Sequence, residues 1–269
     1  MLKNMNEDTS SVRVEFRGIS KIFENLPIVN EVNLPIKAGD FVAFVGPSGC
    51  GKTTLLNMAA GLMDVTSGEV LYNGKKVTSA NTGVGYLTQH DALLPWRDVV
   101  SNVALPLEIK GVAKSERLQK AASMLAKVGL SGFERHRPTQ LSGGMRKRVN
   151  LARTLVYQPQ TLLLDEPFGA LDAQTRIQMH KLLLSLCEEF KLTVLLVTHD
   201  IAEAVTLADK VALFTARPAR LVEVIGIDQP QDRDLFKITD SNDRYFRKIW
   251  DHLAFQMRLQ NGENQDDLP

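Results

Sequence analysis

The architecture of this chain follows from nine consecutive residues, Gly46-Pro47-Ser48-Gly49-Cys50-Gly51-Lys52-Thr53-Thr54. They fit the pattern G-x-x-x-x-G-K-[ST], whose glycines let backbone N–H groups curl around a chain of phosphates. Residues 41–45 are apolar and predict a buried strand, and residues 54–60 predict the start of a helix. A glycine-rich turn that matched the pattern by chance would not need a buried strand before it and a helix after it. The combination of strand, loop and helix therefore predicts a nucleotide-binding site.

The loop also indicates which ligands the site takes. Lys52 is expected to reach the β- and γ-phosphates of ATP, and the Thr53 hydroxyl is expected to ligate Mg²⁺. The backbone N–H groups of the loop and the positive end of the following helix would hold the remaining phosphate oxygens. We therefore expect ATP and Mg²⁺ as the cofactors, with residues 46–54 around the phosphates.

The composition limits the class of partner. The chain has 269 residues and a net charge of +1, which gives no general reason to expect nucleic acid or an acidic membrane surface. Cys50 and Cys187 are too few for a disulfide framework and favour a reducing, cytoplasmic setting. No apolar run is long enough to cross a bilayer, and residues 1–11 lack the apolar core of a secretion signal. A role at a membrane would therefore be peripheral, on the cytoplasmic side.

The order of the predicted elements indicates an α/β core split by helices. Apolar patterns predict strands at residues 12–16, 29–36, 39–45, 68–72, 84–87, 161–165, 193–198 and 211–214. Helical spacing predicts helices at residues 54–60, 99–110, 115–128, 142–157, 173–190, 201–209 and 243–259. A helical segment at about residues 90–158 therefore interrupts a nucleotide-binding core. The two ends, residues 1–11 and 261–269, are expected to be disordered.

Two carboxylates follow the predicted strand at residues 161–165. Asp165 ends this strand, where an aspartate beside a phosphate loop can supply a second contact to Mg²⁺. Glu166 is then placed to polarise the attacking water as a general base. Taken alone, an Asp-Glu pair at a strand end is more often a solvated turn. The phosphate loop is what favours the functional interpretation.

A second candidate site lies 90 residues beyond Lys52, in the stretch Leu141-Ser142-Gly143-Gly144-Met145. Ser142 is a good N-cap residue, and the two glycines leave backbone N–H groups exposed at a helix start. As an isolated pattern, this stretch is typical of a capped helix in a surface loop. Its interpretation as a binding site depends on the motifs around it.

Six motifs follow one another in the sequence: residues 46–54, Gln89, residues 141–145, residues 162–166, Ala170-Leu171-Asp172 and His199. In this order they resemble the ATP-binding subunits of ABC transporters, over about residues 12–221. The resemblance implies a P-loop NTPase core with an antiparallel β-subdomain and an inserted helical subdomain. Residues 222–269 would form a C-terminal extension. Met145 departs from the commoner Gln of the family signature but leaves the glycine amides intact.

The resemblance also implies roles for individual residues. Residues 142–144 would cap the γ-phosphate of ATP held by a second subunit, packed head to tail. Gln89 would touch Mg²⁺ or the attacking water and link the core to the helical insertion. Asp172 would bridge the two subunits, and His199 would contact the γ-phosphate. Phe23 would stack on adenine, although an ordinary core Phe is the alternative.

The resemblance is greatest to bacterial importers of nitrate, sulfonate, taurine and related small solutes, through residues 89–96 and the Ser-Gly-Gly-Met stretch. It implies an ATPase subunit at the cytoplasmic face of the inner (plasma) membrane. Its partners would be permease subunits and, indirectly, a periplasmic or extracellular solute-binding protein. The alternatives are an ABC exporter or lipoprotein-release ATPase, or a non-transport ABC ATPase. Only one phosphate loop and no sustained heptads occur, which disfavours relatives that act on ribosomes or DNA. The sequence does not encode the identity of the solute.

Two further apolar segments have open interpretations. Residues 92–96 carry Leu93, Leu94 and Trp96 with little polar cover, so they form either buried packing or a groove for a partner's helix. Residues 243–259 form an amphipathic pattern of Phe246, Ile249, Trp250, Leu253 and Met257. That helix either packs against the core or binds an effector.

Overall fold

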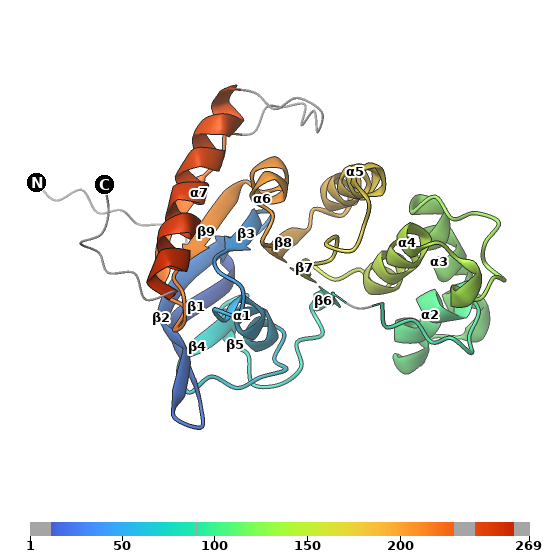
Figure 1. Cartoon of the computed structure of the whole chain (residues 1–269). Helices are drawn as coiled ribbons and strands as arrows, with labels where there is room; N and C mark the ends of the chain where they lie inside the picture. The colour runs from blue at the N-terminus through green and yellow to red at the C-terminus, as the bar shows by residue number, and fades with distance from the viewer. Residues whose placement is uncertain (1–11, 90, 229–239, 261–269) are drawn as a thin grey trace, which may run out of the picture.

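The computed structural model describes residues 12–89, 91–228 and 240–260 (Figure 1). The ends predicted to be disordered, residues 1–11 and 261–269, lie outside this part. The strands are β1 (Val12–Phe23), β2 (Leu26–Lys37), β3 (Phe41–Val45), β4 (Ser67–Tyr72), β5 (Lys75–Lys76), β6 (Val84–Leu87), β7 (Thr161–Asp165), β8 (Thr193–Val197), β9 (Lys210–Phe214) and β10 (Leu221–Gly226). The helices are α1 (Lys52–Ala59), α2 (Val99–Ile109), α3 (Lys114–Lys127), α4 (Gly143–Leu155), α5 (Ala173–Phe190), α6 (Ile201–Leu207) and α7 (Asp240–Gln260).

The central sheet has the strand order β10-β9-β3-β8-β7-β6 within the described residues. The strands from β9 to β6 run parallel, and β10 pairs antiparallel with β9 at the edge. Strands β3 and β8 are buried along their whole length, as expected for parallel strands covered on both faces. Because parallel strands end at the same edge, the segments that follow β3, β7 and β8 meet there. This topology confirms the predicted α/β fold class.

The second sheet is antiparallel, with the strand order β2-β1-β4-β5 among the described residues. Strands β1 and β2 are longer than predicted. The alternation of residues 12–16 breaks at Arg17 and Gly18, but the register shifts between Phe16 and Ile19 and the pairing continues to Phe23. The edge-on contact of Phe16 with Phe44, at 6.2 Å between ring centroids, joins this sheet to the central one. Phe23 is thereby carried to the side of the phosphate loop.

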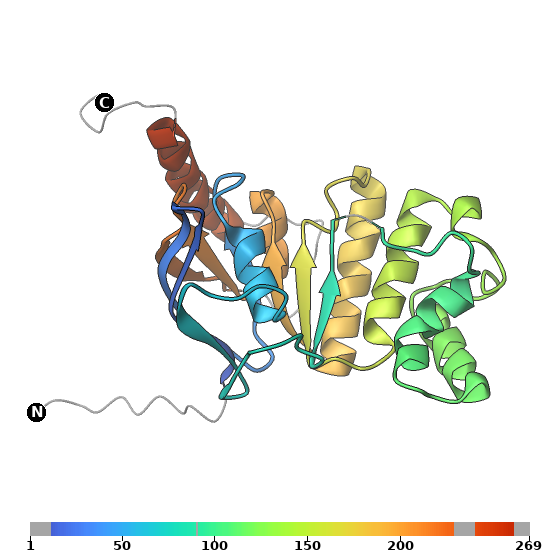
Figure 2. The same ribbon diagram turned by 90° about the horizontal axis from the view of Figure 1, so that it is seen from below.

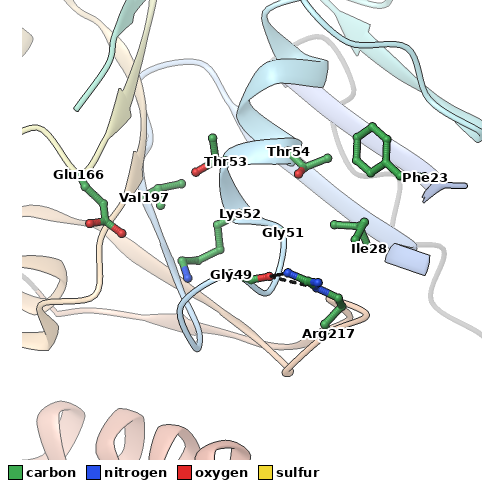
Figure 3. A pocket seen from close by; sticks show the side chains of 10 residues that line it. All are labelled: Phe23, Ile28, Gly49, Gly51, Lys52, Thr53, Thr54, Glu166, Val197 and Arg217. Carbon is green, nitrogen blue, oxygen red and sulfur yellow. Dashed lines mark hydrogen bonds between the residues drawn. The ribbon is translucent and has the colours of Figure 1, made fainter. Parts of the chain in front are cut away.

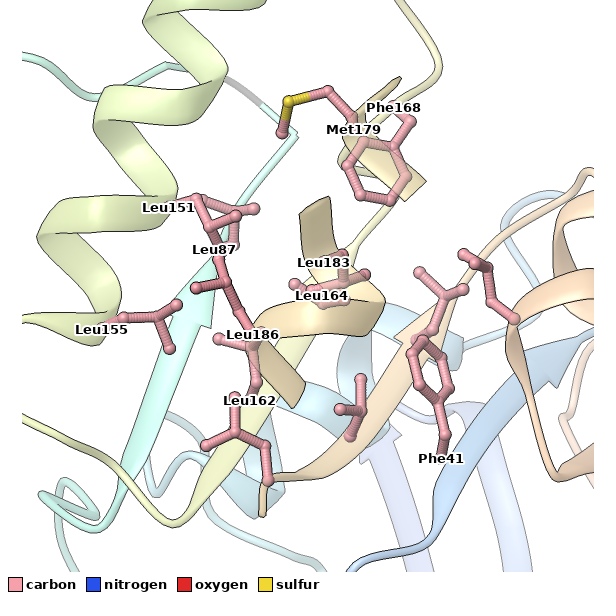
Figure 4. Packing of buried hydrophobic residues seen from close by; sticks show 14 of the residues in the cluster. Phe41, Leu87, Leu151, Leu155, Leu162, Leu164, Phe168, Met179, Leu183 and Leu186 are labelled. Carbon is pink, nitrogen blue, oxygen red and sulfur yellow. The ribbon is translucent and has the colours of Figure 1, made fainter. Parts of the chain in front are cut away.

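Helices α2, α3 and α4 form a separate group beside the β6 edge of the central sheet (Figures 1 and 2). Leu151 and Leu155 of α4 belong to the same buried cluster as Leu87 of β6 and Leu162 of β7 (Figure 4). Burying such side chains stabilises by about 1.5–3 kcal/mol each. The helical group is therefore packed onto the core through α4.

Helix α7 confirms the predicted amphipathic helix, but its apolar side chains divide between two faces. Ile249 and Leu253 are buried against the core, whereas Phe246, Trp250 and Met257 are exposed. The helix therefore packs against the core, as one of the two interpretations expected, but only through part of its apolar pattern. Strand β10 was not predicted at all. No helix in the described residues is long and apolar enough to cross a membrane.

Candidate functional site

The phosphate loop encloses the side chain of Lys52. Its ammonium donates hydrogen bonds to the carbonyl oxygens of Gly46 at 2.7 Å and Pro47 at 2.8 Å, and the residue is 5% exposed. Helix α1 begins at Lys52 itself, two residues earlier than predicted, because the loop passes directly into the helix. Gly51 has φ 127°, and a Cβ there would lie 3.0 Å from the Ile28 carbonyl oxygen. Only glycine fits this position, where the loop passes close to Ile28 and into α1.

A pocket opens on this loop. Its lining residues are Phe23, Ile28, Gly49, Gly51, Lys52, Thr53, Thr54, Glu166, Val197 and Arg217 (Figure 3). Phe23 and Ile28 lie together at one end of the pocket and Glu166 at the other. Phe23 is 41% exposed, so the interpretation of it as a core side chain was wrong. An exposed ring at the apolar end of a phosphate pocket is suited to stack on a base.

Two oxygen ligands meet where a metal ion would bind. The Thr53 hydroxyl donates a hydrogen bond to the Asp165 carboxylate at 2.9 Å. Burial raises the pKa of the Asp165 carboxyl above its ordinary value, and the hydrogen bond from Thr53 opposes that shift. The described residues contain no group of three His, Cys, Asp or Glu side chains that could hold a metal ion. A hydroxyl and a carboxylate fit Mg²⁺, which takes its other ligands from phosphates and water.

Glu166 and His199 form a contact at the tips of neighbouring parallel strands. His199 Nδ1 lies 3.0 Å from Glu166 Oε2, and the backbone N–H of Glu166 donates to the Val197 carbonyl at 2.9 Å. Glu166 has φ 45°, a left-handed conformation that is uncommon outside glycine. Strain of this kind concentrates at functional sites. The structure thus brings together a carboxylate and an imidazole that were predicted from separate stretches of sequence.

Gln89 is exposed at the end of β6, and its backbone is tied to the helical group. Lys147 of α4 donates to the Gln89 carbonyl at 2.7 Å and lies 3.1 Å from a carboxylate oxygen of Asp91. Lys147 is 5% exposed, so both of its partners are needed to compensate its buried charge. Lys147 lies in the basic run 146–148, which by its charge would be expected to form a solvated helix face, and its burial departs from that pattern.

Ser142 and Asp172 each cap a helix. The Ser142 hydroxyl accepts from the Met145 N–H at 3.2 Å, and Asp172 accepts from the Thr175 N–H at 2.9 Å. Hydrogen bonds from Thr175 lower the pKa of Asp172 below its ordinary value. A Cβ on Gly144 would lie 2.6 Å from Thr175, so this glycine lets α4 and α5 approach closely.

The helix-capping residues do not lie in the phosphate pocket of their own chain. Among the described residues that line it, none comes from residues 142–144, and neither Gln89 nor Asp172 is included. The predicted site residues therefore do not form one site within the chain. One group surrounds the phosphate loop, another lies at the starts of α4 and α5, and Gln89 lies just beyond the end of β6.

The arrangement of motifs on this fold matches a known family. The sequence model described as ABC transporter matches residues 29–169. The chain belongs to the ABC transporter family. It is 45% identical over 84% of its length to an uncharacterized ABC transporter ATP-binding protein of Methanocaldococcus jannaschii, covering 86% of that protein. It is 48% identical over 75% of its length to the taurine import ATP-binding protein TauB of Escherichia coli strain K12, covering 79% of it.

Solved ABC cassettes share the fold. A dimeric ATP-binding cassette in a post-hydrolysis state, bound to ADP and Pi, superposes with a TM-score of 0.70 and 32% identity. The similarity covers 81% of this chain and 100% of that one. As an ABC cassette, the chain is an ATP-binding ATPase. The pocket on its phosphate loop is the candidate site for ATP binding and hydrolysis.

Arg176, which was not singled out from the sequence, lines a small pocket together with Glu166 and His199. Its guanidinium lies 3.2 Å from the Asp200 carboxylate and donates to the Leu171 carbonyl at 3.1 Å. It therefore connects the residue before Asp172 to the residue after His199. Arg176 lies four residues after Asp172, about one helical turn along α5, and this spacing indicates that the two side chains lie on the same side of the helix.

Proposed function

We propose that the chain is the ATP-hydrolysing subunit of an importer for a small solute of the nitrate, sulfonate or taurine class. The observation that carries the proposal is that Lys52, Thr53 and Glu166 line one pocket, with Asp165 hydrogen-bonded to Thr53 and His199 in contact with Glu166. The 48% identity to a taurine import subunit supports the class of solute. The chain would work at the cytoplasmic face of the membrane, bound to permease subunits that receive solute from a binding protein.

In this proposal each ATP lies between two copies of the chain, packed head to tail. Ser142, Gly143 and Gly144 expose a helix start that does not line the pocket among the described residues of their own chain. A helix N-terminus with free N–H groups binds a phosphate well. The similarity to a dimeric cassette bound to ADP and Pi supports the proposal that this helix start binds the phosphate of an ATP held by the partner copy. Asp172, at the start of the adjacent helix, would lie at the same interface.

The hydrolytic step follows from the contacts at the strand tips. A water attacks the γ-phosphorus in line with the oxygen that bridges to the β-phosphate, and the bond to that oxygen breaks. Glu166 accepts the proton of the water, and ADP and inorganic phosphate are left. His199 holds Glu166 through Nδ1 and has Nε2 for a γ-phosphate oxygen. Thr53, Asp165 and Gln89 would hold Mg²⁺, which shields the phosphate charge when bound.

Residues 92–96 are proposed as the surface that binds the permease. They lie in an irregular segment before α2, whose backbone is held by Arg153 at Ala92, by Asn102 at Leu94 and by Arg137 at the Trp96 carbonyl. The Trp96 side chain is 68% exposed, which disfavours the buried interpretation for this residue. Lys147 binds both the Gln89 carbonyl and the Asp91 carboxylate, and so connects this segment to the end of β6. A large exposed apolar side chain on a fixed loop is suited to pack against a partner's helix.

Replacing Trp96 by Ala is expected to leave folding and ATP binding intact and to weaken assembly with the permease. Removal of an exposed side chain changes stability by less than about 0.5 kcal/mol, whereas loss of an aromatic anchor weakens an interface by about 2 kcal/mol. Co-purification with the permease, and transport and ATPase rates in proteoliposomes, measure the effect. Leu62→Ala is the matched control, because Leu62 is 62% exposed outside this surface. Normal assembly and transport in Trp96→Ala would reject the proposal that residues 92–96 bind the permease.

A further inference from the structure

Helix α7 contacts the loop between β9 and β10 at two points. Gln256 Oε1 accepts from the backbone N–H of Ala216 at 3.0 Å, and His252 Nε2 lies 3.3 Å from the Phe214 carbonyl oxygen. Gln256 is a polar side chain that is only 6% exposed. A buried amide keeps its hydrogen bond because an unpaired partner is costly. Helix α7 is therefore one of the elements that hold the end of β9 and the loop after it in place.

The same loop contacts the phosphate loop. Arg217 Nη2 donates to the Gly49 carbonyl at 2.7 Å, and Nε donates to the same oxygen at 3.2 Å (Figure 3). A Cβ on Gly46 would lie 2.9 Å from the Phe214 carbonyl oxygen. Residues at both ends of the segment 214–217 thus touch the phosphate loop, at its first glycine and at its tip.

We infer that Arg217 is a positioning residue for ATP binding and that α7 fixes its place through Gln256. The inference rests on the proposed assignment of the pocket to ATP. A loop whose N–H groups face the phosphates turns carbonyl groups the other way, and Arg217 binds one of these. A charged donor that binds a carbonyl from two nitrogens restrains it more than a neutral single bond does. Arg217 also lines the pocket, so it adds a positive charge to the site proposed for ATP.

This arrangement gives the C-terminal extension a role at the nucleotide site. In Figure 3 the pale red helix α7 runs below Arg217, on the side away from the pocket. The chain of contacts runs from Gln256 to Ala216 and, through the next residue, Arg217, to Gly49. A loop held in its binding conformation loses less conformational entropy when ATP binds. Loss of the Gln256 or the Arg217 contact would therefore lower the affinity for ATP more than it lowers the turnover rate.

The test compares Arg217→Ala, Gln256→Leu and the double variant with the unaltered chain. ATP affinity is measured by calorimetry, and ATPase rates are measured at varied ATP. Each single variant is expected to raise the Kd and KM for ATP by about tenfold, with kcat changed less than about twofold. The double variant is expected to bind ATP no more weakly than the single variant with the lower affinity, because both substitutions remove the same set of contacts to Gly49. Arg217→Lys is expected to restore part of the affinity, since its ammonium can still donate to Gly49.

Arg247→Ala is the matched control, because Arg247 lies exposed on α7. An Arg217→Ala variant with the same ATP affinity as this control would overturn the inference. Additive losses in the double variant would overturn the connection between α7 and Arg217. Thermal unfolding of every variant separates these effects from loss of fold. Lys52→Ala is measured in parallel, and unchanged ATP affinity in that variant would contradict the proposed site itself.

Discussion

Replacing Glu166 by Gln is expected to lower ATP turnover by about 10² to 10⁴-fold while ATP binding persists. The amide has nearly the shape of the carboxylate, so the phosphate loop and the contact near His199 stay in place. It cannot accept the proton of the attacking water, and hydrolysis stops at the bound nucleotide. The variant should therefore accumulate as an ATP-bound dimer, which size-exclusion chromatography detects.

The control for this experiment is Glu188→Gln, which makes the same chemical change at an exposed position of α5. Its turnover is expected to match that of the unaltered chain. Wild-type turnover in Glu166→Gln would reject the assignment of Glu166 as general base. A monomeric Glu166→Gln that still binds ATP would contradict the proposed ATP-bound dimer.

Replacing Lys52 by Ala is expected to weaken ATP binding itself, by about 10- to 100-fold in Kd. The Lys52 ammonium lies inside the loop, on the carbonyl oxygens of Gly46 and Pro47, where it would oppose the β- and γ-phosphates of bound ATP. Removing it leaves the phosphate charge without its nearest cation. Calorimetry with ATP measures the change, and Lys37→Ala at an exposed position is the control. An unchanged Kd would contradict the role of Lys52.

The parts of the site that the sequence predicted are local or lie at strand ends. Residues 46–54 form one contiguous motif that can be recognised without any knowledge of long-range packing. Asp165, Glu166 and His199 come from separate stretches, but parallel strands bring their carboxyl ends together at one edge. Once the strands were predicted correctly, the meeting of Glu166 and His199 followed.

The parts that the sequence did not predict depend on long-range packing. Arg217 contacts Gly49 across 168 positions, and Lys147 contacts Gln89 across 58. Neither pair leaves a periodic signal, because each side chain finds a backbone carbonyl, which every residue offers. The division of α7 into a buried and an exposed face has the same origin. Its periodicity predicts the helix but not the width of core that the helix covers.

The most direct test of the proposed function is the ATPase rate of a mixed dimer, in which one chain carries Lys52→Ala and the other Ser142→Arg. If each site joins the phosphate loop of one chain to residues 142–144 of the other, both defects fall in one site and the second site is intact. Each homodimer has two damaged sites. The ATPase rate of the mixed dimer is expected to be well above the rates of both homodimers. A rate no higher than theirs, in dimers whose formation is shown independently, would contradict a site shared between two chains.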